Sequence, residues 1–346
     1  MSESFFEKLS RCYIIAEIGV NHNGDARLAL EMIDRAKSAG ADAVKFQTFT
    51  AENLVSKGTP KVKYQESTTS TSESHYEMIK RLELSREDHK YIFKYCRDVG
   101  IDFISTPYDI ESAIFLSNLG VKFFKTASAD LVDIPLQTYL AKTQRPVMVS
   151  VGMATMGEIE KAVNIYRKAG NNDCILLHCV SNYPCSADSL NLFSMKTISR
   201  AFCMPVGYSD HSVGSEAAML SIACGAKVIE KHFTSDKGLP GPDQKASSSP
   251  EEFNSLVKCI RKAEIILGSP IKRCQPEEMQ MRNVSRKSIV LKKEIFSGET
   301  ITNDHLCLKR PGTGLSSEHI DWFVGKTSLH DKKVGSLLDF SDFIKN

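Results

Sequence analysis

Short apolar segments alternate with longer amphipathic stretches through most of the chain. The apolar segments are rich in β-branched and aromatic residues, which is typical of strands that are buried on both faces. They cover residues 13–19, 43–48, 103–107, 123–128, 147–152, 174–179, 204–209 and 227–233. This pattern predicts eight short strands.

The amphipathic stretches have apolar residues at helical spacing, and most of them end at a glycine. Helices are predicted over residues 25–39, 86–99, 110–119, 156–169, 212–224 and 250–267. Alternating strands and helices are typical of parallel βα units. The sequence therefore predicts the α/β class and a (β/α)8 TIM barrel. An open doubly wound sheet is the alternative, but IGVNHNG after the first strand does not match its glycine-rich fingerprint.

The chain changes character after the last predicted helix. A basic stretch with Pro270 and Pro276 is followed by short apolar segments and turns. We predict a catalytic barrel at 1–268, a linker at 269–285 and a small β-rich module at 286–346. Residues 50–80 are polar and contain the run STTSTSES. We expect an active-site loop or lid there, with a disordered insertion as the alternative.

Composition narrows the class of partner. The 346 residues include 44 basic and 42 acidic ones, and the net charge of +2 gives no reason to expect nucleic acid as a partner. No apolar run is long enough to span a bilayer. The ten cysteines form no CxxC pair, and the N-terminus shows no secretory signal. We therefore expect reduced cysteines and a cytoplasmic protein without a membrane partner.

Polar side chains gather where the predicted strands end, which is where TIM barrels hold their active sites. A charge inside a strand is costly unless it has a partner, so many polar strand ends indicate one shared site. Lysine and hydroxyl side chains together suit phosphate. The candidates for a phosphate site are Lys45, Lys125, Ser128, Ser150 and Ser209. Taken singly, each lysine could also be a surface side chain at a strand edge.

Two histidines, His211 and His232, follow the seventh strand and lie near the end of the eighth. These strands are neighbours in a barrel, so the imidazoles can converge on one ligand. They would suit Mn²⁺, Fe²⁺, Zn²⁺ or Mg²⁺ with open coordination positions. Two separately hydrogen-bonded histidines are the alternative. Asp243, just after the eighth strand, either belongs only to a Gly-Pro-Asp turn or orients a sugar hydroxyl.

Ordered motifs make the chain resemble a known family. In the barrel they are IIAEIGVNHNGD, AGADAVKFQTF, FISTPYD, FFKTAS, VSVGMAT, GYSDHSVG, VIEKHFT and GPDQKAS. They resemble the sialic acid synthase family, the NeuB-type enzymes. The segment ITNDHLCLKRPGTG resembles that family's C-terminal antifreeze-like SAF domain.

The resemblance implies a transferase that joins phosphoenolpyruvate to the open-chain aldehyde of an N-acyl hexosamine. The products would be phosphate and a nine-carbon 2-keto sugar acid. A divalent metal, Mn²⁺ or Mg²⁺, would be held by His211 and His232, and Glu17 would be the catalytic carboxylate. The catalytic set implied is Glu17, Lys45, Lys125, His211 and His232.

The resemblance also implies how the two substrates are held. Ser128, Ser150 and Ser209 would join the two lysines around the phosphate and carboxylate groups. Residues on the acceptor side would be Gln47, Thr106, Ser181 or Asn182, Tyr183 and Asp243. Arg310 matches an SAF-domain arginine that reaches the partner subunit's site, which implies a domain-swapped homodimer.

Departures from the family pattern lie on the acceptor side. The form VSNYP (residues 180–184) resembles the legionaminic acid branch, whose acceptor is 2,4-diacetamido-2,4,6-trideoxymannose, but N-acetylmannosamine stays open as well. Residues 245–247 argue against the pseudaminate branch, which stays as an alternative among related synthases. Two other classes are alternatives: a non-catalytic carbohydrate-binding or ice-binding relative, and a metal-dependent aldolase or isomerase acting on sugar phosphates.

Overall fold

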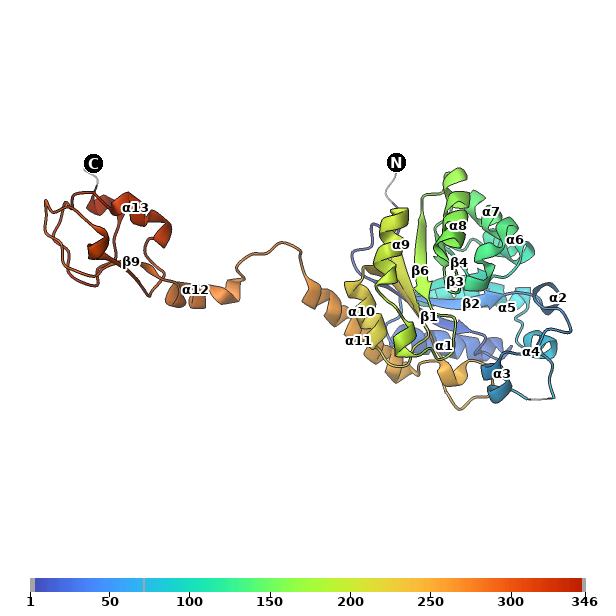
Figure 1. The fold of residues 1–346 in the computed structure, drawn as a ribbon. Helices are drawn as coiled ribbons and strands as arrows, with labels where there is room; N and C mark the ends of the chain where they lie inside the picture. Colours follow the sequence, from blue (N-terminus) through green and yellow to red (C-terminus); the bar gives the residue numbers. More distant parts are fainter. Residues whose placement is uncertain (1–3, 71, 344–346) are drawn as a thin grey trace. The chain divides into compact units, whose positions relative to one another are not determined.

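The computed structural model describes residues 4–70 and 72–343 (Figure 1). The chain forms two compact units, Met1–Gly268 and Ser269–Asn346, which are described separately. None of the helices in the described part of the chain combines the length and apolar character needed to cross a membrane. All ten cysteines are free thiols.

Eight parallel strands form the centre of the first unit, in the order β3-β2-β1-β8-β7-β6-β5-β4. Strands β3 and β4 pack side by side and complete the circle. The strands are β1 Tyr13–Gly19, β2 Ala43–Thr48, β3 Asp102–Pro107, β4 Phe124–Thr126, β5 Val147–Ser150, β6 Cys174–Cys179, β7 Val206–Asp210 and β8 Ala226–His232. The predicted (β/α)8 barrel is confirmed, with every predicted strand present.

Helices surround the barrel (Figure 1). They are α1 Ala26–Ser38, α5 Arg86–Val99, α6 Ile110–Leu119, α7 Ile134–Lys142, α8 Met156–Lys168, α9 Ser194–Phe202, α10 Glu216–Ala223 and α11 Pro250–Leu267. Short 3-10 turns lie at η1 Ser128–Val132, η2 Ala187–Ser189 and η3 Gln244–Ala246. Several helices begin with a side-chain cap, as at Asp25, Thr155 and Ser249.

Helix α10 begins later than the predicted start at residue 212, because the residues before it make other bonds. The backbone N–H and the hydroxyl of Ser212 both donate to Asp210 Oδ1, at 2.8 and 2.6 Å. Lys231 Nζ donates to the carbonyl oxygens of Ser212 at 2.5 Å and Gly214 at 3.1 Å. These carbonyls are therefore unavailable to a longer helix.

Side chains along each strand alternate between the barrel interior and the surrounding helices. Near the amino-terminal ends of the strands, inward side chains form an apolar cluster, to which Phe6 from the segment before β1 is added. The other members are Tyr13, Ile15, Ala43, Ile104, Phe123, Met148, Ile175, Leu177 and Val228. Two positions further along, the inward residue is polar on several strands. Glu17 follows Ile15, and Lys45 follows Ala43. The interior therefore changes from apolar to charged toward the carboxyl ends.

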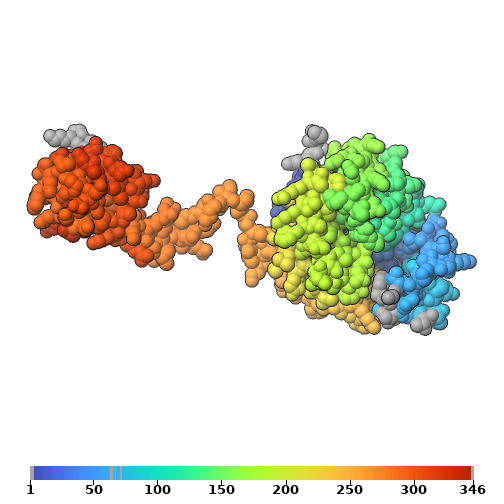
Figure 2. Space-filling model, viewed as in Figure 1, coloured from blue at the N-terminus to red at the C-terminus, as the bar shows by residue number. Residues whose placement is uncertain are grey.

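The polar segment between β2 and β3 contains three short helices: α2 Ala51–Leu54, α3 Lys63–Thr68 and α4 His75–Arg81. The predicted active-site loop therefore contains short helices, and several of its residues line the cavity described below. Helix α4 starts with a capping box, in which Ser74 Oγ accepts from the Glu77 N–H at 3.2 Å and Glu77 Oε2 accepts from the Ser74 N–H at 2.8 Å. Figure 2 shows the atoms of this segment, in blue, at the surface of the barrel unit.

The second unit has its own apolar core, which includes Ile289, Leu291, Ile301 and Phe323. Its elements are η4 Pro276–Glu278, α12 Met279–Ser285, β9 Ser288–Leu291, η5 Asn303–His305, β10 Leu306–Lys309, η6 Ser317–His319, α13 Ile320–Phe323 and η7 Phe340–Asp342. Strands β9 and β10 pair antiparallel. Isolated bridges such as Ile295–Lys332 join the remaining extended pieces. The second unit therefore contains less regular β-strand than the predicted β-rich module would have.

Candidate active site

A cavity of about 570 Å³ lies among residues from the carboxyl ends of the barrel strands and the loops that follow them. This volume is typical of sites for small molecules. Most residues selected from the sequence line it: Glu17, Lys45, Gln47, Thr106, Lys125, Ser128, Ser150, Ser181, Tyr183, Ser209, His211, His232 and Asp243. The barrel therefore brings side chains from all eight strands to one place.

Four buried charged residues, Glu17, Lys45, Lys125 and Glu230, form what we call the charged cluster. Lys45 Nζ lies 2.9 Å from Glu17 Oε2 and 3.8 Å from Glu230 Oε2, and it donates to Thr106 Oγ1 at 3.1 Å. Lys125 Nζ lies 3.6 Å from Glu230 Oε1. Each of the four side chains is at most 4% exposed. Two ammonium groups thus face two carboxylates in a site shielded from water.

Neighbouring polar groups hold the two carboxylates in place. Gln47 Nε2 donates to Glu17 Oε1 at 3.1 Å, and Ser209 Oγ donates to Glu230 Oε1 at 2.9 Å. The register of β1 shifts between Glu17 and Gly19, where φ is +58°. A Cβ at Gly19 would lie 3.1 Å from Glu17 Oε1 and 3.2 Å from Gln47 Nε2. Glycine therefore fits both the backbone conformation and the close approach of these side chains.

The two carboxylates of the charged cluster have different proton affinities. Burial raises the pKa of Glu17 to about 7, although Lys45 acts to lower it. Burial also favours protonation of Glu230, but Lys125 and Lys45 outweigh it and hold the pKa of Glu230 well below its usual range. Burial lowers the pKa of Lys125. Glu17 is therefore the group of the cluster that can exchange a proton near neutral pH.

Hydroxyl groups lie beside the charged cluster on β5 and after β4. Ser150 Oγ is buried and has no hydrogen-bond partner within the described residues. Ser128 Oγ accepts from the Gly152 N–H at 3.1 Å. A Cβ at Gly152 would lie 2.5 Å from both Cys179 Sγ and Ser181 Oγ. Any larger residue at this position would displace the side chains that line the cavity.

The two histidines lie together, with ring centroids 5.5 Å apart. His211 Nδ1 is 2.8 Å from the Val180 carbonyl oxygen, so Nδ1 carries the proton and Nε2 keeps a free lone pair. His232 Nδ1 is buried without a hydrogen-bond partner in the described part of the chain. Burial lowers the pKa of both imidazoles and keeps them neutral. Neutral imidazoles with unused lone pairs fit a divalent metal.

The described residues contain no cluster of three or more His, Cys, Asp or Glu side chains arranged to hold a metal ion. A metal held by His211 and His232 would therefore complete its coordination with substrate or water oxygens. The ring of Tyr183 lies near both imidazoles, tilted against His211 at a centroid distance of 4.1 Å and edge-on to His232 at 5.4 Å. This aromatic side chain limits access to the two histidines from one side.

Two of the residues selected from the sequence are not among those that line the cavity. Asn182 Nδ2 donates to the Pro184 carbonyl at 3.2 Å, and Asn182 is absent from the cavity lining in the described chain. Of the two residues considered after β6, Ser181 is the one that lines the cavity. Arg310 belongs to the second unit, where its Nε donates to the Ser285 carbonyl at 3.1 Å.

The sequence-based list omitted Glu230, which pairs with both lysines of the charged cluster. Alternation along β8 identifies it, since Glu230 lies two positions before His232 and so shares its face of the strand. Lys231 points the other way and forms a buried ion pair with Asp210 at 2.7 Å. The list also omitted His75 of α4, which lines the cavity.

Comparison with known proteins assigns the chain to a family. The model of the NeuB family matches residues 32–272. The N,N'-diacetyllegionaminic acid synthase of Legionella pneumophila is 44% identical over 331 residues, which cover 94% of this chain and 93% of that protein. The enzyme of the same name from Campylobacter jejuni is 41% identical over 332 residues, which cover 95% and 99%.

A solved structure supports the same assignment. The crystal structure of N-acetylneuraminic acid synthetase from Leptospira borgpetersenii, in complex with citrate, matches with a TM-score of 0.71 at 35% identity. The match covers 79% of this chain and 90% of that one. The chain belongs to the NeuB family, the sialic acid synthase family that its motifs resemble.

Proposed function

We propose that this enzyme condenses phosphoenolpyruvate with 2,4-diacetamido-2,4,6-trideoxymannose to give N,N'-diacetyllegionaminic acid and phosphate. Two relatives that are more than 40% identical to this chain over nearly its whole length are named as synthases of N,N'-diacetyllegionaminic acid. The VSNYP form after β6 favours the same branch. N-acetylmannosamine is the competing acceptor.

The reaction balances without an oxidant or reductant. C3 of phosphoenolpyruvate bonds to the aldehyde carbon of the sugar, and the aldehyde oxygen takes up a proton to become a hydroxyl. Water adds to C2 of the former phosphoenolpyruvate and loses a proton. The C2–O bond to phosphate then breaks as the C2 hydroxyl gives its proton to the departing phosphate, which releases inorganic phosphate and leaves a ketone at C2.

The observation that carries the proposal is the charged cluster together with the hydroxyl groups beside it. Lys45 and Lys125 provide positive charge for the phosphate and carboxylate of phosphoenolpyruvate. Ser128 and Ser150 provide hydroxyl groups in the same cavity, and Ser209 also lines it, with its hydroxyl donating to Glu230. Ser150 in particular has a buried oxygen without a partner in the described residues, so a substrate oxygen can occupy that position.

Glu17 is the acid–base group in this proposal. Its pKa near neutrality lets it accept a proton from the attacking water and return one to the new hydroxyl. Lys45, 2.9 Å away, stabilises its charged form. Gln47, Thr106, Ser181, Tyr183 and Asp243 line the remaining cavity on the acceptor side.

His211 and His232 would hold the divalent metal, Mn²⁺ or Mg²⁺. When bound, such an ion polarises a carbonyl oxygen as a Lewis acid. The two neutral imidazoles supply lone pairs, and the Val180 carbonyl fixes the orientation of the His211 ring. We also propose that two chains form a domain-swapped homodimer in the cytoplasm. In this dimer, Arg310 from the SAF domain of one chain would complete the active site in the barrel of its partner.

Release of inorganic phosphate tests the proposed reaction directly. Purified full-length enzyme with Mn²⁺ and phosphoenolpyruvate is given either 2,4-diacetamido-2,4,6-trideoxymannose or N-acetylmannosamine. We expect release with both, with the higher kcat/KM for the diacetamido sugar. A higher value for N-acetylmannosamine would reassign the branch. Folded, metal-loaded enzyme that releases phosphate with neither sugar would refute the proposal.

A further inference from the structure

Most of the large apolar side chains that line the active-site cavity come from one part of the chain. The segment between β2 and β3 contributes Leu54, Val55, Met78, Ile79 and Leu82, which we call the apolar wall. The loops that follow β1, β2 and β3 add Val20, Phe49 and Tyr108. The two histidines come from β8, which pairs with β1, and from the residue after β7. The cavity lining therefore combines an apolar part with a part that holds the charged cluster and the two histidines.

The apolar wall is packed before any ligand arrives. Val20, Phe49, Met78 and Leu82 form a buried cluster of their own, and Leu54, Ile79 and Tyr108 pack against it. Met78 is 0% exposed and Leu82 only 1%. A preformed apolar surface binds apolar groups without the cost of ordering its own side chains.

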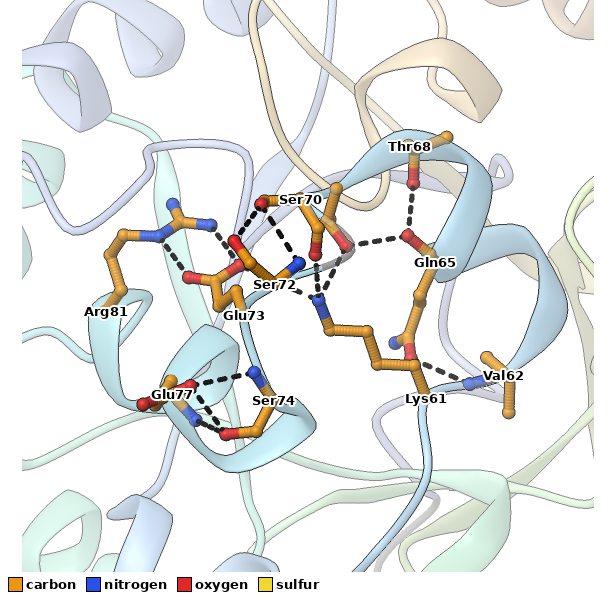
Figure 3. Close-up of polar contacts among 11 residues, drawn as sticks. Lys61, Val62, Gln65, Thr68, Ser70, Ser72, Glu73, Ser74, Glu77 and Arg81 are labelled. Atoms are coloured by element: carbon orange, nitrogen blue, oxygen red, sulfur yellow. Dashed lines mark hydrogen bonds and ion pairs between the residues drawn. The ribbon is translucent and has the colours of Figure 1, made fainter.

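Polar contacts hold the Ser/Thr-rich stretch of the segment against α4 (Figure 3). Lys61 Nζ donates to Thr69 Oγ1 at 3.0 Å and to the Ser70 carbonyl at 2.9 Å, and it lies 3.8 Å from Glu73 Oε2. Arg81 of α4 binds the same carboxylate, with Nε 2.9 Å from Glu73 Oε1. The Lys61 side chain is 7% exposed, so this bridge is shielded from water.

A second set of contacts fixes α2 and α3. Glu52 of α2 accepts from Tyr76 OH at 2.9 Å and lies 3.0 Å from Lys80 Nζ, both on α4. Thr68 Oγ1, at the end of α3, donates to the Pro242 carbonyl at 3.3 Å, next to Asp243 in the cavity. The segment is thus bonded within itself and to the loop after β8, which keeps the apolar wall at the cavity.

We propose that the apolar wall selects the acceptor by receiving the end of the sugar remote from its aldehyde, with the C6 methyl and the C4 acetamido methyl against it. This inference rests on the proposed function. It identifies the residues by which the enzyme would distinguish one acceptor sugar from another. It gives the segment between β2 and β3 a role in specificity.

The chemistry of the two candidate sugars differs at the remote end. The diacetamido sugar has a methyl group at C6 and an acetamido group at C4, whereas N-acetylmannosamine has a hydroxyl at each position. A hydroxyl placed against apolar side chains loses its bonds to water and gains none in return. A methyl group in the same place gains by leaving water. The wall therefore favours the deoxy, acetamido-bearing sugar.

Polar groups between the apolar ones suit the rest of an acetamido group. Ser56, Thr59 and His75 of the segment also line the cavity. His75 Nδ1 is buried and without a hydrogen-bond partner among the described residues, while the other side of the ring bonds the Pro60 carbonyl. The ring can therefore accept a hydrogen bond at Nδ1 from an amide N–H.

The experiment measures kcat/KM for both sugars in the full-length enzyme carrying Val55→Thr or Leu54→Asn. Both substitutions keep the side-chain size nearly constant and place a polar group in the wall. The control is Val62→Thr, the same change at a residue of this segment that is 52% exposed and does not line the cavity. The KM for phosphoenolpyruvate is measured in parallel, since the wall is not expected to affect it.

We expect the ratio of kcat/KM for the diacetamido sugar over N-acetylmannosamine to fall by about tenfold in each wall variant, mainly through the KM of the diacetamido sugar. The ratio should be unchanged in Val62→Thr. If wild-type enzyme is active and the ratio is unchanged in both wall variants, the proposed role of the apolar wall is wrong. The proposed function would still stand. If wild-type enzyme releases phosphate with neither sugar, the proposed function itself is wrong and this inference fails with it.

Discussion

Glu230 shows how one residue can determine the charge state of a site. Its carboxylate lies between Lys45 and Lys125, at 3.8 and 3.6 Å, and is almost fully buried. Removing one member of such a buried ion network leaves an uncompensated charge in a medium that solvates it poorly. Glu230 therefore supports both the fold and the positions of the two lysines.

We expect Glu230→Gln to lower the free energy of unfolding by about 3 kcal/mol at pH 7. Because the pKa of Glu230 is depressed in the folded state, its contribution is present above pH 4.5 and is lost as the pH falls toward 2. Thermal unfolding at pH 7 and at lower pH measures both effects. Glu111→Gln, on the exposed side of α6, is the control and should change little. An unchanged Tm in Glu230→Gln at pH 7 would contradict the role assigned to this residue.

Glu17 has the opposite behaviour, because burial raises its pKa above the value in an unfolded chain. The folded state therefore favours its protonated form, and this group's effect on stability becomes less favourable as the pH rises from 4.5 through 7. The charged cluster is therefore expected to be most stable near pH 4.5, where the contribution of Glu230 is complete and that of Glu17 is not yet lost.

We expect Glu17→Gln to reduce kcat by about 100-fold or more, as the loss of a general acid–base group does. The amide keeps the size of the side chain, so the Tm and Mn²⁺ binding should be retained. In wild-type enzyme, the pH profile of kcat/KM should show an ionisation near neutrality that is absent from the residual activity of the variant. Turnover close to that of wild type would exclude Glu17 from the mechanism.

Metal removal tests the pair of histidines. Treatment with EDTA should abolish phosphate release, and Mn²⁺ should restore it. His232→Ala should weaken Mn²⁺ binding by at least about tenfold, as measured from free Mn²⁺ by electron paramagnetic resonance. His330→Ala, an exposed histidine of the second unit, serves as the control. Equal Mn²⁺ affinity in both variants would mean that the metal binds elsewhere.

At the scale of elements, strand periodicity explains why so much of the site could be predicted. A β-strand carries alternate residues to the same face, so an apolar residue near its start and a polar one near its end mark the inward face. Lys45 on β2 and Lys125 on β4 were selected because they lie near the ends of predicted strands. Glu230 was omitted, although it lies two positions before His232 and so shares its face of β8.

The segment between β2 and β3 could not be predicted in the same way. Its composition is polar, and its helices are too short for a clear period. A signal was nevertheless present, because Ser74 and Glu77 have the spacing of a capping box and are followed by Met78, Ile79 and Leu82. Which way those apolar side chains face depends on contacts with loops distant in the sequence, and local pattern carries no such information.

At the scale of the whole molecule, the proposed domain swap can be tested by mixing two inactive variants. Glu17→Gln lacks the proposed acid–base group, and Arg310→Ala lacks the arginine that the second unit is proposed to supply. If Arg310 acts on the partner's barrel, a mixed dimer contains one complete site. After subunit exchange in an equal mixture, activity should reach about a quarter of the wild-type value.

The controls for this experiment are each variant alone and a mixture prepared without subunit exchange, all of which should stay inactive. Absence of recovery after demonstrated exchange would mean that Arg310 serves its own barrel or no site at all. The helices and strands of each unit are consistent with the sequence pattern. Whether the second unit of one chain completes the active site of another chain depends on how the chains assemble. Sequence periodicity therefore could not establish it, and only the family resemblance suggested it.

The separation between the charged cluster and the apolar wall has a consequence for how such enzymes diversify. The cluster is built by strands β1, β2, β4 and β8, which are widely spaced in the sequence and fixed by the packing of the barrel. Most of the wall comes from one contiguous stretch between two strands. Exchange of that single stretch could retarget the enzyme to a different sugar while leaving the bond-forming machinery untouched.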